Sequence, residues 1–258
     1  MSVKWLFQCC DVNKFYLAQE WAPDEWEPIP INSTAVPEMI PGMDYYDLDD
    51  HARKFGDVFW SYYRHTRKGW ALGTKLLWPL VIKEPFVFSD DDVIFTRHPQ
   101  PLIDEGAFGE CYGFDKLSWN IKECRRMEIL QEVFELDWMD VDRYNDLAFN
   151  CGVWYAPHYH DWERYMHRFW TSNYFDGLSY TSNRFRCLDQ AFMRGYAAKM
   201  DWEGCHHVDT KRTFMRGPEH YNPTYDKLMK GFWVHYAAST HKPAYMKLLR
   251  EINVRTAT

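Results

Sequence analysis

Three consecutive acids stand between two short apolar runs, and this stretch constrains the fold of the chain most. Phe86–Ser89 precedes Asp90–Asp92, and Val93–Phe95 follows. The first run is short, aromatic and β-branched, which predicts a buried strand with the acids at its exposed end. Adjacent carboxylates repel and raise each other's pKa, a cost that a divalent cation removes. Asp90 and Asp92 point the same way in an extended segment, so they suit Mg²⁺ or Mn²⁺; the alternative is a solvated acidic turn.

The composition fits an ordinary folded protein that is unusually aromatic. The 258 residues are 46% hydrophobic, enough for one large α/β domain or two small ones. Aromatic residues make up 18%, with 13 Trp and 17 Tyr, which indicates either a carbohydrate-binding surface or an aromatic core. The net charge of −7 argues against binding long nucleic acid, without excluding a local basic groove.

Cysteine usage and hydropathy bear on the compartment. The seven cysteines are an odd number without zinc-binding spacing, which favours reduced thiols in a cytoplasmic protein. No basic region followed by a long apolar stretch is present near Met1, so we expect no signal peptide. No apolar run is long enough to span a bilayer.

The beginning of the chain predicts a nucleotide-binding α/β arrangement. Val3–Cys10 reads as a first strand and Lys14–Glu20 as a helix, with a polar loop between them. A first strand that ends in such a loop before a helix is typical of nucleotide-binding α/β domains. Further expected elements are an edge strand at Ile29–Ile31, helices at Asp47–Arg67, Trp70–Leu80, Lys122–Phe134 and Asp161–Phe169, and a strand at Phe108–Phe114.

The acidic stretch resembles the DxD motif of nucleotide-sugar glycosyltransferases with the GT-A fold, especially the retaining glycogenin-like and bacterial lipopolysaccharide galactosyltransferase-like family. In that family the motif follows a buried strand and holds the metal on the sugar-nucleotide diphosphate. The resemblance implies one α/β GT-A (Rossmann-like) domain over residues 1–258, with a mixed central sheet flanked by helices. Residues 1–100 would form the nucleotide-binding half and residues 101–258 the acceptor-binding half.

The same resemblance assigns the donor-binding residues near the first strand. The loop with Cys10, Asp11 and Asn13 would hold uracil, with Phe15 or Tyr16 stacked on the base, although the aromatic stands about a residue out of register. From its position alone, Asp11 can instead be a helix N-cap.

The resemblance assigns two further residues, Lys75 and Asp91, to donor binding. Lys75 precedes the DxD strand, where GT-A enzymes offer a basic or polar group to the donor; a solvated surface lysine is the alternative. Asp91 points away from Asp90 and Asp92 and is placed with the donor-binding residues.

Two later segments resemble family motifs that contact the transferred sugar. Phe149-Asn150-Cys151-Gly152-Val153 is similar to F-N-x-G-V, a strand preceded by a tight glycine-containing turn. There Asn150 would contact the sugar, and Gly152 allows close backbone approach or positive φ. Asp189-Gln190 resembles the D-Q pair at a helix start, and both are assigned as catalytic groups facing the anomeric carbon. Without the resemblance, Asn150 is a turn residue and Asp189 a helix N-terminal acid.

A histidine and a lysine near the end of the chain complete the resemblance. His235 to Pro243 is similar to the motif H-x-x-G-x-x-K-P, which implies that His235 is the third metal ligand and Lys242 binds the diphosphate. The sequence departs from the motif, with Ala238 in the glycine position and one additional residue before Lys242. His241 would then replace or assist Lys242, and a core histidine is the alternative for His235.

The resulting hypothesis is a metal-dependent glycosyltransferase, a hexosyl- or pentosyltransferase that uses manganese (Mn²⁺) or Mg²⁺ and a UDP-sugar. Its acceptor hydroxyl would belong to a glycan, a lipid-linked sugar, a protein or a modified nucleic acid base. The resemblance implies retention of configuration; an inverting enzyme would need a carboxylate base such as Asp189. Two further classes stay open: a nucleotidyltransferase, disfavoured because the loop after the first strand has no glycine, and a non-catalytic sugar-binding protein.

Overall fold

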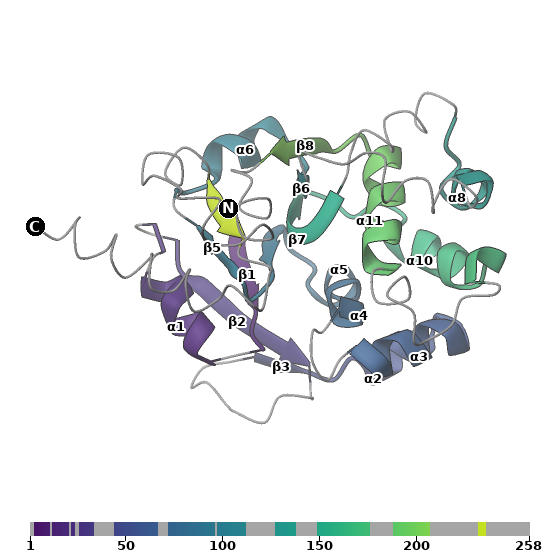
Figure 1. Ribbon diagram of the computed structural model, residues 1–258, viewed down its shortest axis with the longest axis horizontal. Helices are drawn as coiled ribbons and strands as arrows, with labels where there is room; N and C mark the ends of the chain where they lie inside the picture. Colours follow the sequence, from purple (N-terminus) through teal and green to yellow (C-terminus); the bar gives the residue numbers. More distant parts are fainter. Residues whose placement is uncertain are drawn as a thin grey trace, which may run out of the picture.

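A mixed β-sheet forms the centre of the protein (Figure 1). The computed structural model describes residues 3–10, 12–20, 22–23, 26–33, 44–66, 72–95, 97–111, 127–137, 149–175, 188–206 and 232–235. Within these ranges the strands are β1 (Lys4–Gln8), β2 (Pro28–Ser33), β3 (Asp44–Tyr46), β4 (Phe86–Ser89), β5 (Val93–Phe95), β6 (Phe108–Cys111), β7 (Phe149–Ala156), β8 (Glu203–His206) and β9 (Trp233–His235). Seven of them form one sheet in the order β3-β2-β1-β4-β7-β6-β8, and β5 pairs with β9 in a separate ribbon.

Helices cover both faces of the sheet, as the expected α/β class requires (Figure 1). They are α1 (Val12–Glu20), α2 (Asp49–Arg53), α3 (Gly56–Thr66), α4 (Leu72–Lys75), α5 (Trp78–Val81), α6 (Gln100–Glu105), α8 (Met127–Phe134), α10 (Trp162–Trp170) and α11 (Leu188–Lys199), with a 3₁₀ turn at Asn173–Phe175. Alternate residues of one strand serve opposite faces: Phe86 and Phe88 pack with α3, α10 and α11, whereas Val87 packs with α1, α6 and the β5–β9 ribbon.

The strand directions bring the polar ends of several strands to one edge. β1 runs parallel to β2 and β4, β7 runs antiparallel to β4 and β6, and β6 runs parallel to β8. The carboxyl ends of β1, β4 and β6 therefore lie at the edge where β7 begins. Cys10, Asp90 and Glu110 stand at this edge with Gly152 of β7.

The ribbon brings a segment late in the sequence to the same edge. β5 starts directly after the acids, and its antiparallel register pairs Val93 with His235. The acids and His235 are therefore neighbours because of strand pairing, although they lie far apart in sequence. The β5–β9 ribbon is fixed in turn by burial of Phe95 and Trp233, whose ring centroids lie 5.7 Å apart.

Buried polar side chains attach the short helices α4 and α5 to β1. The Gln8 side-chain oxygen accepts hydrogen bonds from the Thr74 hydroxyl and the Trp78 indole, both at 3.0 Å. Buried polar groups need such partners, because an unmade hydrogen bond costs about 1–3 kcal/mol in the interior. This attachment fixes the position of Lys75, the residue after Thr74.

The sequence predictions for β1, β4, α1, α10 and the start of α11 are confirmed, whereas two expected long helices are each divided. The expected Asp47–Arg67 helix consists of α2 and α3, separated where Gly56 adopts φ +84°, a conformation that other residues rarely take. Within the expected Trp70–Leu80 helix lie α4 and α5, and α5 restarts at Trp78 with Pro79 in its first turn. The N-terminal part of the expected Lys122–Phe134 helix and residues 112–114 of the expected strand lie outside the described residues.

The expected edge strand at Ile29–Ile31 is an interior strand. β2 lies between β1 and β3, so the prediction from its prolines is wrong for the strand as a whole. Its described pairing with β3 covers Ile31–Ser33. Pro28 and Pro30 precede this described pairing and lie opposite Trp5 and Phe7 of β1.

Among the described residues, the aromatic surplus serves mainly the core. The buried tryptophans are Trp5, Trp26, Trp78, Trp154, Trp162, Trp170, Trp202 and Trp233. Cys9, Cys10 and Cys151 are present as thiols and not as disulfides. Within the described ranges, the helices are too short or too polar to cross a bilayer.

Candidate active site and metal centre

Asp90, Asp92 and His235 form a group that can hold a metal ion. One ligand atom from each residue lies within 4.8 Å of the others, with both acids in the turn between β4 and β5 and the histidine at the end of β9. Two carboxylates and one imidazole are a donor set that suits Mn²⁺. Asp90 Oδ1 is buried and accepts no hydrogen bond from the described part of the chain, as expected of an oxygen whose natural partner is a cation. The residues therefore fit a divalent metal.

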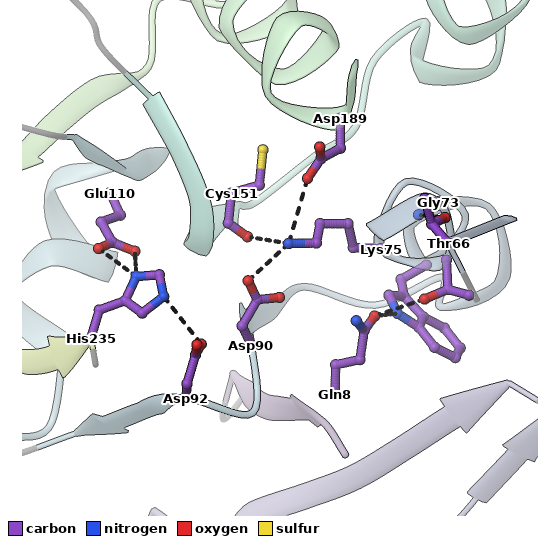
Figure 2. A network of polar contacts seen from close by, with 12 residues as sticks. Gln8, Thr66, Gly73, Lys75, Asp90, Asp92, Glu110, Cys151, Asp189 and His235 are labelled. Carbon is purple, nitrogen blue, oxygen red and sulfur yellow. Dashed lines mark hydrogen bonds and ion pairs between the residues drawn. The ribbon is translucent and has the colours of Figure 1, made fainter. Parts of the chain in front are cut away.

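His235 is held from both sides of its ring (Figure 2). Its Nδ1 lies 2.8 Å from Oε1 and 2.9 Å from Oε2 of Glu110, and its Nε2 lies 3.1 Å from Oδ1 of Asp92. Burial alone would lower the pKa of His235, but Glu110 and Asp92 outweigh it and raise this pKa to about 10. Without a metal, the ring is therefore a cation between two acids.

Glu110 is a site residue that the sequence analysis does not single out. It is fully buried on β6, which lies within the expected strand Phe108–Phe114. Because an acid is almost never fully buried without a partner, a lone acid within an expected strand is a usable signal. The identity of its partner could not be predicted, because His235 comes from a different sheet.

Gly152 lies within β7 and not in a turn before it, so the expected glycine-containing turn is wrong. A Cβ at this position would stand 2.3 Å from Cε1 of His235 and 2.5 Å from Oε2 of Glu110. The carbonyl of Gly152 accepts a hydrogen bond of 2.8 Å from the backbone N–H of Asp90. The backbone approach at Gly152 therefore accommodates the His235–Glu110 pair and fixes the first metal ligand.

Lys75 is buried in the site, so the alternative of a solvated surface lysine is wrong. Its side chain is 2% exposed, and its Nζ lies 2.8 Å from Oδ2 of Asp90 and 3.6 Å from Oδ2 of Asp189. The ammonium also donates to the carbonyl of Cys151 at 3.2 Å (Figure 2). Burial lowers the pKa of Lys75, but Asp90 and Asp189 raise it further, and the group stays charged.

Asp189 and Gln190 lie in the first turn of α11, which begins at Leu188. The Asp189 carboxylate accepts a 3.1 Å hydrogen bond from the Tyr62 hydroxyl, which in turn accepts one of 3.3 Å from the Asp189 N–H. Burial raises the pKa of Asp189, and the neighbouring Lys75 opposes that rise. The Asp189 side chain is buried, whereas Gln190 is partly exposed.

The expected nucleotide loop places its residues differently. Phe15 is buried in the core against Phe7, whereas Tyr16 is 51% exposed, so only Tyr16 offers an accessible ring face. Asn13 is exposed on α1, and Asp91 forms a 2.6 Å ion pair with Lys14. Burial and the nearby Asp91 raise the pKa of the Cys10 thiol, which favours its protonated form.

Asp11, His241 and Lys242 lie outside the described residues. Asn150 lies on β7, next to Cys151 and Gly152 in the sequence.

Comparisons with known proteins give a distant likeness in chain path. No protein-family model and no curated protein matches the sequence. Two solved structures are similar: an active-site mutant of LgtC, with a TM-score of 0.44, and the galactosyltransferase LgtC in complex with donor and acceptor sugar analogues, with a TM-score of 0.43. Each is 15% identical to this chain, and the match covers 92% of this chain and 88% of the other. Likeness at this level carries no weight for the chemistry, which depends on the side chains described above.

Proposed function

We propose that this protein is a metal-dependent glycosyltransferase that moves a sugar from a nucleoside-diphosphate sugar, a UDP-sugar, to an acceptor hydroxyl. The observation that carries the proposal is the convergence of Asp90, Asp92 and His235 at the carboxyl edge of β1 and β4. Ligands of open α/β sheets bind outside the carboxyl ends of the strands, so a nucleotide would lie next to these three side chains.

The three residues would hold Mn²⁺ or Mg²⁺, which would neutralise the charge that develops on the leaving diphosphate. Lys242, with or without His241, would contribute a second positive charge to the same phosphate. Asn13, Tyr16 and the loop residues Cys10 and Asp11 would line the base and ribose, and Asp91 would lie at the same end of the site.

The buried Lys75–Asp189 pair would orient the groups around the anomeric carbon. Lys75 bonds Asp90 directly, so the metal ligand and the start of α11 are coupled through one ammonium. Gln190, which is partly exposed, would face the oxocarbenium-like centre. The negative charge of the nearby Asp189 carboxylate would help to stabilise that centre. Asn150 and the backbone at Gly152 would contact the transferred sugar.

Burial of Asp189 favours retention over inversion. An inverting enzyme needs a base that reaches the acceptor hydroxyl, and Asp189 is 1% exposed and already bonded to Tyr62. In the retaining reaction the acceptor oxygen attacks the anomeric carbon on the face from which the diphosphate departs. The bond between the anomeric carbon and the phosphate oxygen breaks, and the departing phosphate takes the acceptor proton.

The proposal is tested by UDP release from UDP-glucose, UDP-galactose and further UDP-sugars, with Mn²⁺, with Mg²⁺ and with a chelator. We expect metal-dependent release, faster with a matching acceptor, and release at least about 100-fold slower from Asp92→Asn. Binding of UDP-sugars without release from any of them would instead identify a non-catalytic sugar-binding protein. Formation of pyrophosphate from UTP and a sugar phosphate would identify a nucleotidyltransferase.

A further inference from the structure

Glu110 has no part in the proposed chemistry, yet it is a fully buried acid beside the candidate metal ligands. We propose that Glu110 is a positioning residue, which holds the His235 ring so that Nε2 faces the metal ion, and that Gly152 provides the space for this pair. The inference rests on the metal centre of the proposed function. It assigns a role to a residue outside the ligand group.

The contact geometry separates the two nitrogens of the ring. Both carboxylate oxygens of Glu110 lie within 2.9 Å of Nδ1, so this nitrogen is the donor to Glu110. Nε2 is then the atom left for the ion, and it already points at Oδ1 of Asp92, 3.1 Å away (Figure 2). Carboxylates that accept from a metal-binding histidine in this way fix its tautomer and ring orientation and raise its basicity as a ligand.

The backbone around Glu110 is irregular at the place where this contact forms. The register between β6 and β7 shifts between Gly109 and Cys111, so Glu110 lies at an interruption of the ladder. Such irregularities redirect a side chain and are common beside active sites. On the facing strand, any side chain at Gly152 would overlap both His235 and Glu110. A strand interruption and a glycine therefore make room for one ion pair.

Stability alone is a poor explanation for this pair. Burying an acid and an imidazole is costly, and replacing buried ion pairs with apolar residues is often neutral or stabilising. If a cation binds between Asp90, Asp92 and His235, the buried ion pair has a function. Glu110 then orients the ligand His235 without itself being a ligand.

The test compares wild type with Glu110→Gln, Glu110→Met and the control Phe108→Leu. Phe108 is a buried residue of the same strand that packs on Trp233, so its substitution perturbs β6 and β9 without removing the acceptor. The dissociation constant of Mn²⁺ is measured by electron paramagnetic resonance without any sugar donor. In the Zn²⁺-loaded protein, ¹⁵N NMR of the His235 ring reports which nitrogen carries the proton.

We expect Glu110→Met to weaken Mn²⁺ binding on the order of 10–100-fold, as loss of such a partner does at other metal sites. Glu110→Gln, which keeps an oxygen acceptor, should fall between Glu110→Met and wild type, and Phe108→Leu should match wild type. Wild type should show a proton on Nδ1 and metal on Nε2, and Glu110→Met should lose this single arrangement. Because Glu110→Gln preserves the shape of the side chain, it provides the comparison if Glu110→Met does not fold.

The outcomes separate this inference from the proposed function. Unchanged Mn²⁺ affinity in both Glu110 variants, or equal weakening in Phe108→Leu, would overturn the role of Glu110 while leaving glycosyl transfer intact. If the Mn²⁺ affinities follow the expected order but no donor releases UDP, the role of Glu110 is supported and the transferase function is rejected. A wild-type protein that binds no Mn²⁺ would overturn both.

Discussion

Lys75 joins two acids whose charges would otherwise repel, and it does so out of contact with water. Its ammonium lies within 3.6 Å of both Asp90 and Asp189, and its side chain is 2% exposed. The removal of one member of a buried ion pair leaves an uncompensated charge, which costs far more than the pair itself contributes. At the scale of single residues, the stability of the site therefore depends on the ammonium of Lys75, which compensates the charges of Asp90 and Asp189.

We expect Lys75→Met to lower the free energy of unfolding by about 3–5 kcal/mol, because the buried Asp189 and the partly buried Asp90 lose their shared partner. Urea denaturation measures the loss. The matched control is Lys4→Met, which breaks the exposed ion pair with Glu84 and should cost at most about 1 kcal/mol. Equal losses in the two variants would mean that Lys75 is not held as a buried cation.

Substitution of Asp92 should lower turnover without lowering the stability of the fold, and Asp91 provides the control. Asp92→Asn keeps an oxygen acceptor for Nε2 of His235 but removes a charge from the metal, so we expect at least about 100-fold lower metal-dependent turnover. The melting temperature should stay close to wild type. Asp91→Asn is the control, since Asp91 pairs with Lys14 and should affect turnover less. Wild-type turnover of Asp92→Asn at ordinary Mn²⁺ would reject the metal assignment.

Two glycines allow a controlled test of space in the site. Gly152→Ala would place a methyl group against His235 and Glu110, and Gly195→Ala would place one 2.3 Å from the Phe134 ring, remote from the ligands. Overpacking of this kind costs about 1–3 kcal/mol. We expect both variants to lose stability in urea but only Gly152→Ala to lose Mn²⁺ affinity. Retained affinity in Gly152→Ala would show that the His235–Glu110 pair can move without consequence.

At the scale of elements, α8 and α10 are joined through one acid at the end of α8. Glu135 adopts φ +55° directly after the helix, and its carboxylate accepts hydrogen bonds from Arg164 and Arg168 of α10. The N–H of Leu136 donates to the carbonyl of Gln131 at 3.0 Å, which closes the helix end around this left-handed residue. A non-glycine residue is tolerated there because its side chain ties the two helices together.

This contact predicts a pH dependence of stability. The arginine hydrogen bonds lower the pKa of Glu135 below its ordinary value of 4.5, so its stabilising contribution is present above that pH and is lost as the pH falls. We expect Glu135→Gln to differ from wild type in urea midpoint at pH about 7 and to differ less at pH about 3. Glu128→Gln, on the first turn of the same helix, is the control. A difference that does not shrink in acid would contradict the ion pairs.

The sequence predicts an element well when the residues that determine it lie within that element, and poorly when its position depends on contacts with distant segments. The strands at Lys4–Gln8, Phe86–Ser89 and Val93–Phe95 follow from short apolar runs, and the helices at α1, α10 and α11 follow from local pattern. The internal position of β2 does not, because it depends on β3 pairing beyond Pro30. The burial of Lys75 and the partner of Glu110 depend on approaches between distant segments, which no local pattern encodes.

The candidate ligands are predictable for a different reason. Asp90, Asp92 and His235 are found through a resemblance that fixes their order along the chain, and the described geometry groups them. Tyr62 and Glu110, which bond Asp189 and His235, belong to no such motif. Residues that support a site are harder to find from sequence than residues that form it, since their types vary with the packing around them.

At the scale of the whole molecule, ligand binding should appear as a change in stability. A ligand that binds only the folded state stabilises it by about 2.7 kcal/mol at a hundred times its Kd. We therefore expect UDP with Mn²⁺ to raise the melting temperature and UDP with a chelator to do much less, as measured by thermal shift. Adenosine diphosphate with Mn²⁺ is the control for non-specific binding of a nucleotide–metal complex. Equal shifts for UDP with and without metal would show that the ion does not bridge nucleotide and protein.

The pairing of β5 with β9 has a consequence for when the candidate metal site is completed during synthesis. The two acids leave the ribosome long before His235, which stands on a strand that follows all other described elements. A nascent chain that has emerged as far as β8 already contains all seven strands of the large sheet. Such a chain has only two of the three candidate ligands. The candidate metal centre is therefore completed only after β9 has been translated, because His235 lies on that strand.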